Sequence, residues 1–267
     1  MFRFSKKGPL EYLEALALTD CNFLTHAFCT RKGGVSRGRF ENLNVSVKEG
    51  DAEENVRANL RIIADAFGIT VEQFVIVSQV HGEEILTVDR PPADLASSVR
   101  LEFDAIVTDQ PGVAICVKTA DCVPIFFADR KRKVVGVAHA GWRGTALSVA
   151  GKTTQALISR FNCRAGDIIA AIGPAIGPCC YKVDEPVVNA MKGQRGSESF
   201  FSKGAKPGEW MLDLAGANRM QIMGCGIPEM NTHVARSCTS CRRDMFFSHR
   251  GEGGNTGRQL NFIMLNR

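Results

Sequence analysis

The sequence lacks the segments that a membrane anchor, an export signal or a flexible linker would need. No window reaches the roughly 18 consecutive apolar residues of a membrane-spanning helix, and no low-complexity stretch divides the chain. Residues 1–20 contain no apolar core followed by a small-residue cleavage site. These absences predict a cytoplasmic protein that has no membrane partner.

Strong charge of either sign is also lacking. The 33 basic and 28 acidic residues leave a net charge of +5, and the basic residues are scattered along the sequence. This small excess suits an anionic small molecule as readily as a nucleic acid. With 267 residues, 45% of them hydrophobic, we expect a single domain over residues 1–267, although two fused lobes are an alternative. The oligomeric state, monomer or homodimer, stays open.

The apolar patterns predict an α+β fold, a layered sandwich in which a mixed β-sheet is flanked by helices. Helical periodicity covers residues 51–69, where Asp51 is a predicted cap, and residues 144–161, where Thr145 has the same role. Further helices are expected over 183–191 and 212–226. Strands are predicted from runs rich in β-branched residues, at 74–80, 84–89, 104–109, 112–119, 123–129, 133–140, 167–176, 232–238, 246–250 and 260–265. The middle third of the chain should therefore form one sheet.

Three metal-binding side chains stand where predicted strands run into loops. His81 lies in SQVHG, Cys122 in KTADCVPI and His139 in VAHAGWRG, and the chain has only five histidines. Two histidines and one cysteine leave the fourth position of a zinc ion open, which is the catalytic arrangement. The same residues also fit a copper site, or a Cys122–His139 pair in which imidazole activates the thiol.

Several other features are expected to be structural. The ten cysteines of a cytosolic chain should be reduced thiols rather than a disulfide framework. Cys238 and Cys241 form a CxxC that could bind metal or cycle as a redox pair, but no second CxxC accompanies it, so we predict structural thiols. Cys179 and Cys180 follow a Gly-Pro turn, and we predict turn and packing residues there. Two arginines followed by two phenylalanines, at 242–247, suggest RNA stacking only superficially, and we expect no nucleic-acid partner.

Six sequence blocks resemble the YfiH-like family, whose members carry the names polyphenol oxidase, laccase-domain protein, purine nucleoside phosphorylase and adenosine deaminase. The blocks are TRKGGVSRGRFENLNVS (30–46), SQVHG (78–82), KTADCVPI (118–125), VAHAGWRGT (137–145), IGPAIGPCCYKVDE (172–185) and CTSCRRDMFFSHRGEGGNTGRQ (238–259). The resemblance implies that His81, Cys122 and His139 are the metal ligands. It also implies phosphorolysis of adenosine, inosine, guanosine and S-methyl-5'-thioadenosine, and hydrolytic deamination of adenosine. Lys182 and His249 depart from residues that are frequent at these positions in the family.

Phosphorolysis requires cations that hold phosphate beside the anomeric carbon, and Arg31, Arg143 and Arg250 are the candidates. Deamination requires zinc-activated water and a proton shuttle, for which Asp121, Glu83 and Glu84 are near the ligands in sequence. The cofactor is thus predicted to be Zn²⁺, with Cu²⁺ as the alternative, and the partners are purine nucleosides and phosphate.

Three alternative functions remain open from the sequence. A copper-dependent polyphenol oxidase ranks second, although five histidines are too few for a four-copper centre. A hydrolase that uses Cys122 and His139 would need no metal. A non-enzymatic binding protein would require the ligand set to be structural.

Overall fold

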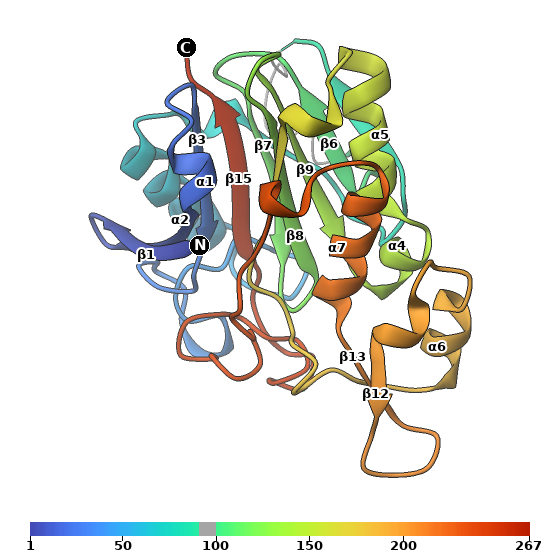
Figure 1. Cartoon of the computed structure of the whole chain (residues 1–267). Coiled ribbons are helices and arrows are strands. Elements are labelled where there is room, and N and C mark those ends of the chain that lie inside the picture. Colours follow the sequence, from blue (N-terminus) through green and yellow to red (C-terminus); the bar gives the residue numbers. More distant parts are fainter. Residues whose placement is uncertain (91–99) are drawn as a thin grey trace.

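The chain folds into two six-stranded β-sheets that pack face to face, in a computed structural model that describes residues 1–90 and 100–267 (Figure 1). In the first sheet the order is β1 (Phe2–Lys7), β2 (Leu10–Ala15), β3 (Leu24–Cys29), β15 (Gln259–Leu265), β7 (Ala114–Thr119) and β4 (Phe74–Ile76). In the second it is β14 (Thr232–Val234), β10 (Ile168–Ile172), β8 (Val123–Asp129), β9 (Val134–Ala140), β6 (Ala105–Thr108) and β5 (Ile85–Val88). Both sheets are mixed. In the first, β4 pairs parallel with β7 and β15 pairs antiparallel with it; in the second, β5 pairs parallel with β6 and β8 pairs antiparallel with β9.

Helices cover both outer faces of this pair of sheets. Helix α2 (Glu53–Phe67) packs on the first sheet, and α5 (Val149–Phe161) with α7 (Leu214–Gly224) packs on the second (Figure 1). Shorter helices are α1 (Leu16–Thr19), α4 (Trp142–Ala146) and α6 (Glu185–Met191). A small third sheet joins β11 (Lys182–Val183), β13 (Trp210–Leu212) and β12 (Phe201–Lys203).

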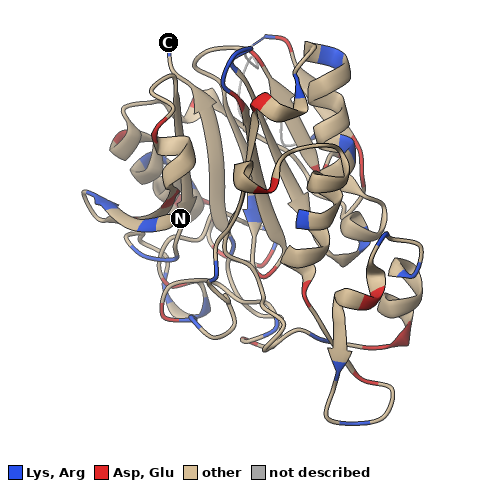
Figure 2. Ribbon diagram, viewed as in Figure 1, with Lys and Arg blue, Asp and Glu red and all other residues tan. Residues whose placement is uncertain are grey.

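Apolar side chains form the layer between the two main sheets. Phe28 of the first sheet and Phe126 of the second stack there with ring centroids 4.1 Å apart, and both rings are fully buried. Burial of such a side chain stabilises the fold by about 1.5–3 kcal/mol. Charged residues lie mainly on the helices and loops around the sheets (Figure 2). The predicted class, a layered α+β sandwich with mixed sheets and flanking helices, is confirmed.

Several predicted elements need correction. The strands of the middle third divide between two sheets instead of forming one. The helix predicted over 144–161 is interrupted at Ser148, whose φ of +64° lies outside the helical region, and Thr145 is an internal residue of α4 rather than a cap. Helix α2 begins after Ala52 rather than at Asp51.

The C-terminal third also differs from its prediction. Residues 246–250 form turns and irregular backbone instead of a strand, and only Thr232–Val234 of the segment 232–238 is a strand. The three N-terminal strands β1, β2 and β3 were not predicted. Within the described residues, no helix is both long enough and apolar enough to cross a membrane.

Candidate metal centre

A cavity of about 450 Å³ opens where the chain passes from one sheet to the other. Its volume lies within the roughly 300–1,000 Å³ of small-molecule sites. The lining residues are Ser46, Lys48, Glu49, Gln79, His81, Lys118, Thr119, Ala120, Asp121, Cys122, His139, Gly141, Trp142, Arg143, Ile176, Tyr181, Leu214, His249, Arg250 and Arg258. They come from seven separate regions of the sequence, so only the folded chain creates the cavity.

The structure brings His81, Cys122 and His139 together on one wall of this cavity. One nitrogen of each imidazole and the Cys122 sulfur all lie within 4.8 Å of one another. His81 lies in the loop between β4 and β5, and Cys122 in the turn between β7 and β8, so each occupies a passage between the sheets. His139 is in β9 and is 3% exposed, whereas His81 is exposed to solvent. The donor set therefore has a buried side and a side open to the cavity.

Two residues in these passages have left-handed backbone. His81 has a φ of +62° and Asp121, directly before Cys122, has a φ of +91°. Such backbone costs a non-glycine residue about 1–3 kcal/mol and is concentrated at functional sites. Hydrogen bonds join the two passages nearby: the Gln79 amide accepts from Lys118 N at 2.7 Å and donates to Lys118 O at 2.8 Å.

The carboxylate of Asp104 positions both histidines. His139 Nδ1–H donates to Asp104 Oδ1 at 2.7 Å, which leaves Nε2 free to bind a metal. The same carboxylate accepts backbone N–H bonds from Val80, His81 and Gly82 at 3.2, 3.1 and 2.6 Å. Asp104 is completely buried. Asp104 was not predicted as a functional residue, although it stands at the start of a predicted strand, between His81 and Cys122 in the sequence.

Electrostatic coupling within the centre favours a thiolate beside a charged imidazole. Burial raises the pKa of Cys122, but the neighbouring His139 and His81 together outweigh burial and lower the pKa of this thiol below its ordinary value. Burial lowers the pKa of His139, while Cys122 and Asp104 together raise it above its ordinary value. A sulfur that loses its proton readily is suited to metal binding and also to nucleophilic attack.

The three predicted arginines have different surroundings. Arg143 and Arg250 line the cavity. Arg31 does not: its guanidinium donates to Glu41 O at 2.7 Å and to Arg243 O at 2.9 Å, and its Nη1 is 2.9 Å from a Glu252 oxygen. These contacts give Arg31 a role in holding surface loops together.

Three further cations in the cavity were missed, namely Lys48, Lys118 and Arg258. Burial lowers the pKa of Lys118, and the charge of Lys48 lowers it further. Arg258 pairs with Glu49 at 3.1 Å. Lys118 and Arg258 stand in the blocks KTADC and GNTGRQ, but a lone basic residue in a motif does not reveal that several will converge.

Of the carboxylates predicted as proton shuttles, only Asp121 lines the cavity, and it already accepts two hydrogen bonds. Asp121 accepts a hydrogen bond from the Thr239 hydroxyl at 2.6 Å and another from Arg250 N at 2.7 Å. Glu83 pairs with Lys152, and neither Glu83 nor Glu84 is among the residues that line the cavity. Asp121 thus holds the loop that carries Arg250.

The aromatic residues at 246–247 are fully buried. Phe247 packs under the Arg31 guanidinium, 4.5 Å from its ring centroid, and Arg242 pairs with Asp244. Neither ring is therefore available to stack on a nucleobase.

Comparison with known proteins identifies the family. The family model described as multi-copper polyphenol oxidoreductase laccase matches residues 25–266. The chain belongs to this family. A purine nucleoside phosphorylase, YlmD of Geobacillus stearothermophilus, is 41% identical over 88% of this chain and 87% of its own. An adenosine deaminase, RL5 of an unknown prokaryote, is 31% identical over 89% of this chain and 92% of its own.

A solved structure shows the same fold over nearly the whole chain. The crystal structure of the hypothetical protein YfiH from Bacillus licheniformis superposes with a TM-score of 0.91 at 35% identity, over 99% of this chain and 98% of that one. The resemblance carried by the six sequence blocks is confirmed.

Proposed function

We propose that this chain is a zinc-dependent enzyme that acts on purine nucleosides at the His81–Cys122–His139 centre. The reactions are phosphorolysis of adenosine, inosine, guanosine and S-methyl-5'-thioadenosine, and deamination of adenosine. The observation that carries the proposal is a three-donor set that opens into a cavity lined by cations. The names of two relatives, a purine nucleoside phosphorylase and an adenosine deaminase, support the substrate class. Ten free cysteines support a reducing, cytoplasmic location.

The residues present fit a zinc ion. Two imidazole nitrogens and one thiolate within 4.8 Å of one another match the donors of a catalytic zinc site, and Asp104 fixes the ring of His139. When bound, the ion supplies a Lewis acid and lowers the pKa of coordinated water. His81, as the exposed donor, stands at the side from which substrate enters.

Basic side chains would hold the phosphate. Arg143, Arg250, Lys48 and Lys118 line the same cavity, and their positive charge stabilises an anion placed beside the sugar. Positioning matters more here than a strong nucleophile, because the glycosidic bond weakens toward an oxocarbenium-like state. We infer that these cations orient phosphate for attack on the anomeric carbon.

Two aromatic residues give the cavity an apolar wall. Tyr181 and Trp142 both line it, and the Arg250 guanidinium lies 5.2 Å from the Tyr181 ring centroid. An aromatic ring offers a flat apolar face on which a purine can stack. This wall therefore favours a substrate with a planar base rather than one without an aromatic group.

A copper-dependent polyphenol oxidase is the second candidate, because the matching family model carries that description. Among the described residues, three histidines line the cavity; His81 and His139 group with Cys122, and His249 lies outside that group. His26 lies in the core, where its Nε2 accepts a hydrogen bond from Ala15 N at 2.9 Å, so it is engaged away from the cavity. A centre of several coppers would need more imidazoles than remain.

The first test measures metal content and turnover on the same samples. We expect Cys122→Ala to lose one zinc per chain and to abolish formation of free base and ribose 1-phosphate from nucleoside and phosphate. The control Cys225→Ala replaces a thiol whose hydrogen bond goes to Gly151 O, and it should change neither quantity. Turnover that persists in Cys122→Ala would contradict the proposed centre.

A chelator distinguishes the metal enzyme from a hydrolase that uses Cys122 as nucleophile. Chelation should stop phosphorolysis, and added zinc should restore it. Activity that survives chelation but is lost on thiol alkylation would favour the nucleophile instead. Activity restored by copper alone, with phenol oxidation, would favour the oxidase.

A further inference from the structure

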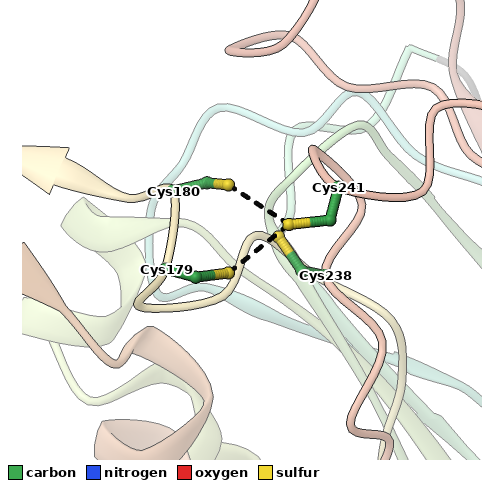
Figure 3. Close-up of side chains that lie close together, drawn as sticks. All are labelled: Cys179, Cys180, Cys238 and Cys241. Atoms are coloured by element: carbon green, nitrogen blue, oxygen red, sulfur yellow. Dashed lines mark hydrogen bonds between the residues drawn. The ribbon is translucent and has the colours of Figure 1, made fainter.

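Four cysteines from two distant loops meet outside the cavity just described (Figure 3). Cys179 and Cys180 lie in the turn between β10 and β11, and Cys238 and Cys241 follow β14. The four sulfur atoms all lie within 4.8 Å of one another. Cys179 and Cys241 are exposed. Cys179 lies in a turn as predicted, but its side chain is not packed in the interior.

The backbone brings the two loops together in a defined register. Ala175 and Cys238 form an isolated parallel bridge, and Thr239 N donates to Ala175 O at 3.0 Å. Gly177 N donates to the Cys238 sulfur at 3.2 Å. A Cβ atom at Gly177 would lie only 3.3 Å from both Cys179 Sγ and Cys238 Cβ. A side chain at this position would therefore press on the cysteines of both loops.

The sulfur separations match a shared metal ion better than a disulfide. Cys241 Sγ lies 3.4 Å from Cys180 Sγ and 3.6 Å from Cys179 Sγ. Sulfurs joined in a disulfide are about 2.05 Å apart. In a tetrahedral site with zinc–sulfur bonds of about 2.3 Å, the sulfurs are roughly 3.8 Å apart. Small side-chain movements would bring all four into that arrangement.

We propose that Cys179, Cys180, Cys238 and Cys241 bind a second zinc ion in a closed, structural site. Four thiolates fill the tetrahedral shell and leave no position for water or substrate, in contrast to the open centre at Cys122. Binding displaces the thiol protons into solvent, and the exposed faces of Cys179 and Cys241 give the ion a way in.

The second ion would fasten two loops that form part of the cavity wall. Cys180 directly precedes Tyr181, and the loop from Cys241 continues to Arg250. Arg250 Nη1 donates to Lys182 O at 2.7 Å, which already joins the two loops on the cavity side. A metal on the other side would limit their separation and so preserve the spacing of Tyr181 and Arg250.

Zinc stoichiometry tests the proposal independently of any enzymatic activity. We expect two zinc ions per chain in the wild-type protein, one in the double variant Cys238→Ser/Cys241→Ser and one in Cys122→Ala. Cys225→Ser should retain two, because its half-buried thiol lies outside both clusters. A double variant with the same zinc content as the wild type would overturn the second site.

If the double variant does not fold, cobalt substitution of Cys122→Ala tests the second site instead, because this variant keeps all four cysteines of the cluster. One Co²⁺ per chain with intense thiolate-to-metal charge-transfer bands and tetrahedral d–d bands is expected. Absence of these bands, or a disulfide detected by mass spectrometry of the freshly purified wild type, would overturn the proposal. Iron recovered in place of zinc would overturn the choice of metal.

Discussion

Asp104 is a single residue on which two candidate ligands depend. Its carboxylate accepts from the His139 ring and from three backbone N–H groups of the His81 loop. We predict that Asp104→Asn weakens zinc binding roughly tenfold to a hundredfold, because one accepting oxygen becomes an amide that cannot accept. Zinc affinity measured by chelator competition checks this prediction.

Asp129→Asn is the matched control for that substitution. Asp129 is also a completely buried carboxylate that accepts two backbone N–H bonds, from Lys131 and Arg132, but it lies at the far end of β8. It should lower stability without changing zinc affinity. Equal zinc affinities for Asp104→Asn and the wild type would show that the carboxylate does not position the ligands.

The buried His26 should make the folded protein less stable in mild acid. Burial lowers the pKa of this histidine from 6.5 to about 4. Between those values the unfolded chain binds the proton and the folded chain does not, so stability is complete above pH 6.5 and falls as the pH decreases toward 4. The expected contribution to the loss between pH 7 and pH 5 is about 2 kcal/mol.

Denaturant unfolding of the wild type and His26→Gln at both pH values isolates this contribution. The variant cannot titrate, so its free energy of unfolding should fall by about 2 kcal/mol less than that of the wild type. Identical losses in the two proteins would mean that His26 already accepts a proton in the folded state.

At the junction of β9 and α4, Gly141 sets how close the helix can come to the centre. A Cβ atom there would lie 2.9 Å from His81 Cδ2 and 3.0 Å from Cys122 Sγ. The φ of Gly141 is −74°, so alanine fits its backbone. We predict that Gly141→Ala displaces two ligands and loses zinc from this centre while the fold persists.

Gly166→Ala provides the comparison, because a Cβ atom at Gly166 would meet nothing within 4 Å. Elemental analysis and circular dichroism of both variants separate metal loss from unfolding. A Gly141→Ala variant with full zinc content would show that the ligand side chains can move away from the new methyl group.

Element by element, local signals predicted helices better than strand partners. The apolar period located α2 within two residues at each end, because one face of that helix packs on the first sheet. The break at Ser148 was missed, since tertiary packing of α4 and α5 overrides a sequence pattern that continues through it. Strands β8, β9 and β15 are buried along their whole length. Their sequences therefore show no alternation of apolar and polar residues from which the sheet or the partner strand could be predicted.

Across the whole molecule, convergence of distant segments limits what sequence predicts about the site. His81, Cys122 and His139 could be predicted as ligands because few histidines or cysteines of the sequence stand at the end of an apolar run. Lys48, Arg258 and the four-cysteine cluster were not, because their proximity arises from the crossing of loops between sheets. The C-terminal strand β15 shows the same effect, since it lies between β3 and β7 of the first sheet.

The position of the candidate centre links zinc to the stability of both sheets. His81 and Cys122 lie where the chain passes from the first sheet to the second, and one apolar core is shared between the sheets. We therefore propose that residues 1–267 unfold as one domain. Free zinc at 100 times its Kd should stabilise the fold by about 2.7 kcal/mol through this site. For a chain of this size the expected rise in Tm is roughly 5–10 °C.

Calorimetry of the wild type and Cys122→Ala, each with zinc and with chelator, measures this linkage. The shift caused by zinc should be smaller in the variant, because only the four-cysteine site can then contribute. Subtraction of the two shifts isolates the centre at Cys122. Two separate transitions, of which only one moves with zinc, would instead show that the sheets unfold independently and that the ion stabilises one of them.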